Sequence, residues 1–168
     1  MTLTPAQPAT WYNTPERIAA LVARAQSWEH TPWRANSAFP GKGGGVSCHN
    51  LQAELHRGGP LPQDFVTPRG SVRETLNGPA TAILDWCDAH LGDVFKKAEG
   101  PAVVGDLVFF RAEEKSAQLL HFGTVVPGLE PHHTLRVVHV LLFRGVMFSE
   151  MADPAYGNLL AAIRRPAP

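Results

Sequence analysis

Cys48 is the side chain of this sequence that is best placed for nucleophilic chemistry. It follows the glycine-rich stretch 39–47 and begins a predicted short helix that ends at Arg57. The first turn of a helix presents unpaired backbone N–H groups and the positive end of the helix dipole, and both favour a thiolate over a thiol. Ser47 supplies the oxygen for an N-cap. The pattern makes Cys48 a candidate nucleophile, although a free cysteine is more often a small buried hydrophobe.

Two histidines fall on neighbouring predicted strands, where they can serve such a thiol. His121 and Gly123 point to the same face of one strand, because side chains alternate, and the glycine leaves room beside the imidazole. His139 lies in the next strand, and direct pairing brings same-face Cβ atoms within ~5 Å. A thiol, an imidazole that carries its proton and a polar group that orients the imidazole are the parts of thiol-dependent acyl transfer. If the Cys48 helix packs on that face, the three residues form a Cys-His-His group.

Other chemistries fit the sequence less well. A histidine within a strand is more often half-buried and structural than catalytic. The glycines before Cys48 would also suit a phosphate, but their spacing is not that of a Walker loop. Zinc binding is disfavoured because neither C-x-x-C nor H-E-x-x-H occurs, so we expect no metal and no cofactor. The remaining histidines of interest are expected to be solvated: His30, His56, His90, His132 and His133.

Composition limits the class of protein. The 168 residues fit one domain of ordinary size, and 15 basic residues balance 15 acidic ones. A neutral chain without long basic runs gives no electrostatic case for nucleic acid or an anionic membrane. No secretory signal is visible and no apolar run reaches the ~20 residues of a membrane span. We therefore expect a chain that is cytoplasmic as synthesised, with phage delivery or non-classical export left open, and Cys87 as a core residue.

The order of predicted elements indicates an α+β fold. Residues 1–13 read as an N-terminal arm, and residues 14–168 as one domain that begins with a helix at Thr14-Pro15. An amphipathic stretch with Ile83 and Leu91 predicts a further helix before Gly92. Helices followed by strands suggest N-terminal helices packed on an antiparallel sheet. The predicted strands cover residues 107–110, 119–126, 135–143 and 146–148, and the tail 154–165 fits either a helix or a strand.

Segments in this order resemble the NlpC family of papain-like cysteine peptidases, the cell-wall hydrolases of bacteria and their phages. Residues 25–33 resemble the family's helix that ends in tryptophan before a Gly-Thr-Pro-Tyr-type segment. Gly-Val-Ser-Cys-His-Asn-Leu over 45–51 resembles the nucleophile segment Gly-Val-Asp-Cys-Ser-Gly-Leu. Gly-Asp-Leu-Val-Phe-Phe over 105–110, with Leu-His-Phe-Gly-Thr-Val over 120–125, resembles the strand pair that carries the base. Val-His-Val over 138–140, with Gly-Val over 145–146, resembles the segment of the third polar residue.

The resemblance implies a papain-like fold and hydrolysis of an amide bond in peptidoglycan stem peptides. By that resemblance Cys48 is the nucleophile, His121 the base and His139 its orienter. Ser47 stands where the family has aspartate, His49-Asn50 where it has Ser-Gly, and Trp33 where it has a tyrosine that lines the site. We expect the substrate to meet Trp33, Ser47, His49 and Gly123. Two alternatives stay open: a papain-like deamidase or acyltransferase with another substrate, and a catalytically silent binding domain. The oligomeric state is not indicated.

Overall fold

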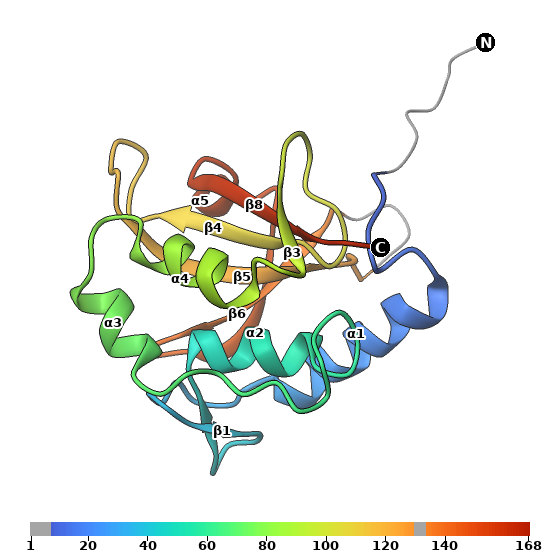
Figure 1. Cartoon of the computed structure of the whole chain (residues 1–168), viewed down its shortest axis with the longest axis horizontal. Coiled ribbons are helices and arrows are strands. Elements are labelled where there is room, and N and C mark those ends of the chain that lie inside the picture. The colour runs from blue at the N-terminus through green and yellow to red at the C-terminus, as the bar shows by residue number, and fades with distance from the viewer. Residues whose placement is uncertain (1–7, 130–133) are drawn as a thin grey trace.

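The computed structural model of the chain describes residues 8–129 and 134–168, and these form an α+β fold (Figure 1). A six-stranded antiparallel sheet has the order β3-β8-β4-β5-β6-β7, and a separate two-stranded ribbon pairs β1 with β2. The helices are α1 Pro15–Trp28, α2 Cys48–His56, α3 Ser71–Asn77, α4 Ala82–Leu91 and α5 Pro154–Gly157. The strands are β1 Ala38–Phe39, β2 Gly45–Val46, β3 Phe95–Ala98, β4 Leu107–Arg111, β5 Leu119–Val126, β6 Arg136–Leu141, β7 Gly145–Glu150 and β8 Leu160–Pro166.

The first two helices begin where their capping residues predict. Thr14 accepts a hydrogen bond from the Arg17 backbone N–H and precedes the N1 proline of α1. Ser47 accepts from the Asn50 backbone N–H in the same way and fixes the start of α2 at Cys48. Each cap satisfies a donor that has no partner within its helix. The helix predicted from Thr14-Pro15 and the helix predicted from Cys48 are both confirmed.

The two helices cover one face of the sheet. Leu51 and Leu55 of α2 pack with Val126 and Val138 in one core cluster, which also holds the buried side of α1. α2 therefore lies on the face that carries Phe122 and Thr124, the residues that alternate with His121, His139 and Gly123 along the strands. The condition under which Cys48, His121 and His139 would share one face of the sheet is not met, because the apolar stripe of α2 packs against valines of the other face.

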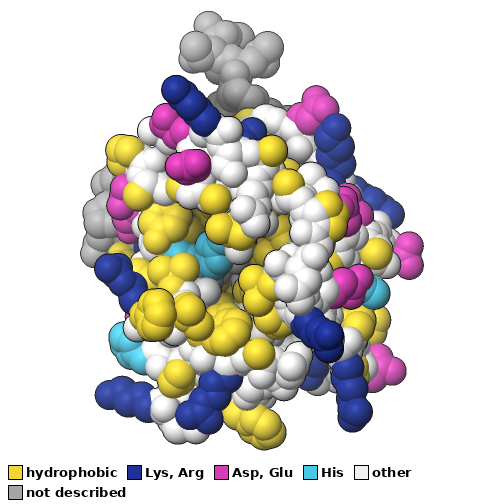
Figure 2. All heavy atoms as spheres, turned by 90° about the vertical axis from the view of Figure 1, so that its left-hand side faces the viewer, with side chains coloured by type: hydrophobic (Ala, Val, Ile, Leu, Met, Phe, Trp, Pro, Cys, Tyr) yellow, Lys and Arg dark blue, Asp and Glu magenta, His cyan; other side chains and the backbone are white. Residues whose placement is uncertain are grey.

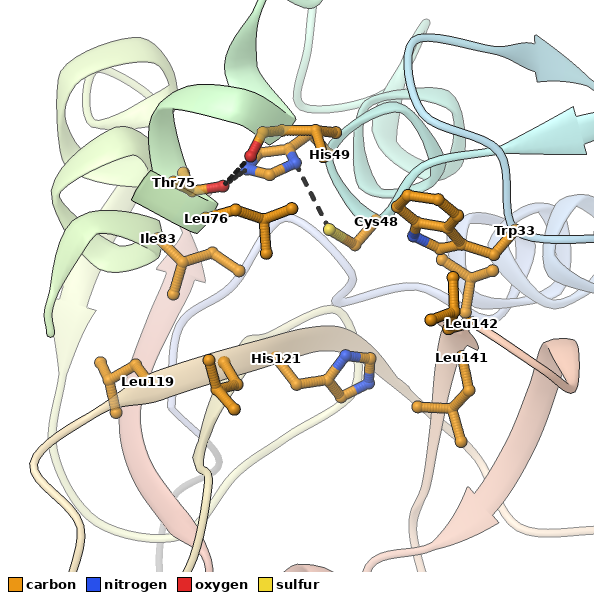
Figure 3. Close-up of a pocket in the computed structure, with 13 residues that line it drawn as sticks. Trp33, Cys48, His49, Thr75, Leu76, Ile83, Leu119, His121, Leu141 and Leu142 are labelled. Carbon is orange, nitrogen blue, oxygen red and sulfur yellow. Dashed lines mark hydrogen bonds between the residues drawn. The ribbon is translucent and has the colours of Figure 1, made fainter. Parts of the chain in front are cut away.

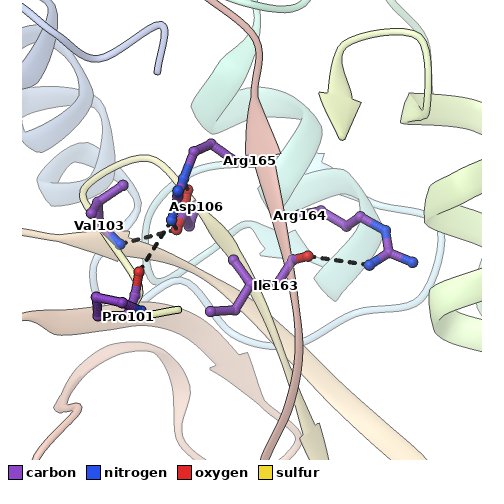
Figure 4. Close-up of polar contacts among 6 residues, drawn as sticks. All are labelled: Pro101, Val103, Asp106, Ile163, Arg164 and Arg165. Atoms are coloured by element: carbon purple, nitrogen blue, oxygen red, sulfur yellow. Dashed lines mark hydrogen bonds and ion pairs between the residues drawn. The ribbon is translucent and has the colours of Figure 1, made fainter. Parts of the chain in front are cut away.

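The tail of the chain is both a helix and a strand. α5 is a single turn, and β8 then inserts between β3 and β4. Arg165 fixes this strand with two hydrogen bonds to the fully buried Asp106, at 2.9 and 2.7 Å, and Asp106 also accepts from the Val103 N–H (Figure 4). Burial raises the pKa of Asp106, while the hydrogen bond from Arg165 opposes the rise. The aspartate of the Gly-Asp turn thus anchors the C-terminal strand.

The structure corrects two expectations, one about His56 and one about the N-terminal arm. His56, expected in solvent, is fully buried: its Nδ1 lies 2.8 Å from the Tyr12 hydroxyl and its Nε2 2.9 Å from Thr124 Oγ1. Tyr12, placed in the arm, is itself a core residue, and the adjacent Trp11 N–H donates to the Pro166 carbonyl. The packed domain therefore starts before residue 14. His30 and His90 are exposed, as expected, and His132 and His133 lie outside the described residues.

Candidate active site

A pocket of about 350 Å³ opens beside the N-terminus of α2 (Figures 2 and 3). Cys48 and His49 enter it from α2, and His121 enters it from β5 on the opposite wall. Trp33 lies beside Cys48, and Thr75 of α3 lies beside His49. The pocket thus brings together the candidate nucleophile and three ring side chains that come from separate parts of the chain.

The Cys48 thiol is held by its neighbour in sequence. Its Sγ lies 3.3 Å from His49 Nδ1, within hydrogen-bonding distance for sulfur. Burial raises the pKa of Cys48 to about 12, and the backbone N–H groups of His49 and Cys48 offset only part of this rise. The expectation that the helix start makes a thiolate is therefore wrong for the resting protein. Desolvation of the sulfur outweighs the helix N-terminus, and the thiol keeps its proton at neutral pH.

His49 has one hydrogen-bonding arrangement that satisfies both ring nitrogens. Thr75 Oγ1 donates to the Ser71 carbonyl at 3.0 Å, so it accepts from His49 Nε2, which is 3.3 Å away. This tautomer leaves His49 Nδ1 as the acceptor of the Cys48 S–H. The ring is almost fully buried and packs edge-on against Trp86, and burial lowers the pKa of His49 to about 4. His49 lines the pocket as expected, but the thiol occupies the nitrogen that a substrate would meet.

His121 belongs to a chain of hydrogen bonds that ends inside the protein. Its Nε2 lies 2.5 Å from His139 Nδ1, and His139 Nε2 lies 2.8 Å from the buried Ser149 Oγ of β7. Burial lowers the pKa of His121 to about 4 and that of His139 to about 3, so both rings are neutral at pH 7. Two proton arrangements fit this chain. In one of them His121 Nε2 and His139 Nε2 both donate, which leaves His121 Nδ1 free to accept a proton.

Cys48 and His121 face the same pocket without touching. No hydrogen bond joins them, and the Cys48 sulfur is turned toward His49 (Figure 3). His121 sits next to a register shift, where Phe110 pairs with His121 but Arg111 pairs with Leu119. Bulges of this kind re-aim side chains at the end of a strand. This register shift lies where the His121 side chain enters the pocket, although α2 packs on the opposite face of the sheet.

The other predicted site residues have different outcomes. Trp33 lines the pocket. Ser47 is almost fully buried as the N-cap of α2 and lines a separate, smaller cavity of about 70 Å³. Gly123 does not line the pocket: a Cβ there would lie 2.5 Å from Val137 Cγ2 and 3.1 Å from His139 Cβ. The space beside Gly123 is filled by β6, so the glycine serves the close approach of the two strands and does not make room for substrate.

Sequence reasoning missed Ser149 and Thr75 as partners of the histidines. Ser149 lies in β7, just after the strand predicted over 146–148, and its contact with His139 depends on the β6–β7 register, in which Val137 pairs with Ser149. Thr75 lies on α3, which was not predicted. Within residues 8–129 and 134–168 there is no cluster of three His, Cys, Asp or Glu side chains that could hold a metal. Over the same residues, no helix is long and apolar enough to cross a membrane.

Two solved structures share this architecture. A lipoprotein-like protein of the NLP/P60 family from Staphylococcus aureus superposes with a TM-score of 0.58 and 17% identity over 99% of this chain. An NlpC/P60 family protein from Bacillus cereus gives 0.54 and 16% over 90% of the chain. The chain has the fold of NlpC/P60 proteins. Protein-family models and curated proteins give no match to the sequence.

The chain spans 46% and 40% of the two solved proteins, so it covers less than half of either. The sequence-based expectation of a papain-like α+β fold, with N-terminal helices on an antiparallel sheet, is confirmed.

Proposed function

We propose that the protein is a cysteine hydrolase that cleaves an amide bond in peptidoglycan stem peptides. The observation that carries this proposal is that the Cys48 thiol and His121 lie on facing walls of one pocket, with the buried His139 and Ser149 hydrogen-bonded in a chain behind His121. Cys48 is the nucleophile, His121 is the base, and His139 is a positioning residue that holds the tautomer of His121. The stem peptide as substrate is our proposal, and the NlpC/P60 type of fold supports it. Phage delivery or non-classical export to the wall is part of the proposal.

The reaction begins with transfer of the thiol proton. Cys48 turns from His49 toward the substrate, its sulfur attacks the carbonyl carbon, and its proton passes to His121 Nδ1. Backbone N–H groups near the Cys48 sulfur, those of Cys48 and His49, stabilise the oxyanion, and such a donor is worth roughly 3 kcal/mol where one has been removed from other enzymes. The His121 imidazolium then protonates the leaving amine. Water hydrolyses the resulting thioester, with His121 as base, and the acid product leaves a protonated thiol.

Because His49 holds the protonated thiol, the first proton transfer differs from that of an enzyme in which a thiolate–imidazolium pair exists before substrate binds. The sulfur, His49, His121 and His139 are all neutral at rest, so the proton moves only when substrate is present. Such an order resembles the general-base activation of a hydroxyl nucleophile. It predicts a thiol that is slow toward small alkylating reagents compared with a free cysteine, yet competent when a carbonyl is bound.

The test is hydrolysis of a synthetic stem tetrapeptide, followed by mass spectrometry, in wild type and four variants. We expect Cys48→Ser and His121→Ala to lose nearly all turnover, because one removes the nucleophile and the other the base. His139→Gln should retain a measurable fraction, since an amide oxygen still accepts from His121 Nε2–H. Cys87→Ser, in a buried helix position outside the pocket, is the matched control and should keep full activity. Equal turnover in wild type and His121→Ala would contradict the assignment of the base.

A second candidate function is acyl transfer or deamidation on another substrate. It is favoured by one observation: no lining residue of the pocket carries a formal charge, whereas stem peptides carry several carboxylates. A transferase would consume an acyl donor without wall peptides. Release of the acyl group to an added amine, in preference to water, would select this function over hydrolysis.

A further inference from the structure

The pocket beside Cys48 is lined mostly by hydrocarbon. None of its lining residues is Asp, Glu, Lys or Arg. Of the polar side chains in it, His49 bonds the thiol, Thr75 bonds His49 and a backbone carbonyl, and His121 bonds His139 through one ring nitrogen and keeps the other free. The remaining walls are supplied by the Trp33 indole and by aliphatic side chains from α3, α4, β5, β6 and the turn that follows β6.

The same apolar character continues at the mouth. Leu76 is 65% exposed, Leu120 49% and Leu142 57%, although all three line the pocket. Figure 2 looks onto this face and shows a hollow with histidine at its floor and hydrophobic side chains around it. Single exposed leucines are ordinary, but several gathered around one cavity mark a binding site for an apolar group. A volume of about 350 Å³ lies within the usual range of small-molecule pockets.

We propose that this pocket binds an uncharged aliphatic acyl group, so that the substrate presents a hydrocarbon chain or an aliphatic side chain next to the carbonyl that Cys48 attacks. The inference rests on the proposed role of Cys48 as nucleophile, and it names the substrate class of that site. A carboxylate or ammonium group in this position would lose its water without gaining a counter-charge, which is costly in an apolar cavity. An aliphatic group instead exchanges water for the side chains of Leu76, Ile83 and Leu142.

The chemical step is the one already described for the thiol. A bond forms between Cys48 Sγ and the acyl carbon, and the bond from that carbon to the leaving nitrogen or oxygen breaks. The thiol proton reaches the leaving group through an imidazole of the site. Water then adds to the thioester and releases the aliphatic acid, so no oxidant or reductant is required.

The experiment compares three alkylating reagents at Cys48: iodoacetamide, iodoacetate and N-hexyl iodoacetamide. Second-order rate constants are measured by mass spectrometry of the Cys48 peptide and divided by those for free cysteine, which removes the intrinsic reactivity of each reagent. We expect the hexyl reagent to exceed iodoacetamide at least tenfold, since each buried methylene contributes about fourfold. Iodoacetate should fall below iodoacetamide at least tenfold, because it brings a charge into the pocket.

Variants at the surface locate the effect. Leu76→Glu places a carboxylate at the mouth and should cut the hexyl preference at least fivefold. Val66→Glu is the matched control: Val66 is 76% exposed and does not line the pocket, so the preference should stay at the wild-type value. Both positions are exposed, so both variants are expected to fold. Equal losses in the two variants would assign the effect to the overall charge of the protein and overturn the inference.

The outcomes separate the two proposals. Labelling of Cys48 by iodoacetamide without a hexyl preference, or with iodoacetate as fast, overturns the aliphatic pocket and leaves the nucleophile standing. Failure of all three reagents to label Cys48 bears on the nucleophile, which stem-peptide hydrolysis tests, and not on the pocket. The pocket is then judged by octanamide and octanoate binding to Cys48→Ser, measured by NMR titration. Tighter binding of octanamide, with shifts at the pocket residues, supports the aliphatic site whatever the thiol does, and the absence of binding overturns it.

Discussion

Acid should destabilise this protein, and His56 should account for a measurable part of the effect. The ring is fully buried between Tyr12 and Thr124, and burial, assisted by nearby Arg24, lowers its pKa to about 3. An unfolded histidine has a pKa of about 6.5. Below that value the unfolded chain takes up a proton that the folded protein refuses. The contribution of neutral His56 to the free energy of unfolding is therefore fully present above pH 6.5 and is lost as the pH falls from 6.5 toward 3.

The size of the loss follows from the two pKa values. A pH of 5.0 lies about 1.5 units below the pKa of the unfolded ring, and each unit is worth about 1.4 kcal/mol. Protonation of His56 in the unfolded chain should therefore lower the free energy of unfolding by about 2 kcal/mol at this pH. His49, His121 and His139 also have lowered pKa values and act in the same direction. A domain of ordinary stability has about 5–15 kcal/mol to lose. Wild type should therefore lose a large share of its stability by pH 5.

The assay is urea unfolding at pH 7.5 and pH 5.0, followed by circular dichroism, in wild type, His56→Gln and His30→Gln. His56→Gln will be less stable at both pH values, because a buried hydrogen bond is lost, but the difference between the two pH values should be about 2 kcal/mol smaller than in wild type. His30 is exposed, and His30→Gln should keep the wild-type difference. A wild-type difference in His56→Gln would refute the claim that His56 stays neutral in the fold.

Three further results are expected. Iodoacetamide should label Cys48 in preference to Cys87, because Cys48 lines the pocket whereas Cys87 is fully buried, and peptide mass spectrometry checks this; preferential labelling of Cys87 would contradict it. Ser149→Ala should lower kcat several-fold and change the tautomer signals of His139 in ¹⁵N NMR, whereas Ser149→Thr keeps the hydroxyl and should rescue both. Gly123→Ala should lower the free energy of unfolding by more than about 2 kcal/mol, because the added Cβ would meet the Val138 carbonyl oxygen at 2.7 Å; a stable variant would show that β6 can shift.

The sequence by itself determined the local structure of the site. Thr14-Pro15 and Ser47 carry the capping chemistry that starts α1 and α2, so the position of Cys48 at a helix start was predictable. Strand alternation made a contact between His121 and His139 feasible, and the two rings do meet, with ring nitrogens 2.5 Å apart. These features depend on residues close in sequence or on neighbouring strands, where spacing fixes geometry.

Only the tertiary structure decided the chemistry around the thiol. Which face of the sheet α2 covers depends on how apolar stripes from distant segments match, and no local pattern encodes that match. The same holds for Ser149 and Thr75, whose histidine partners are set by strand register and by the packing of α3. The pKa of Cys48 reversed from the helix-based expectation because desolvation depends on every neighbour that excludes water, and those neighbours come from the whole chain.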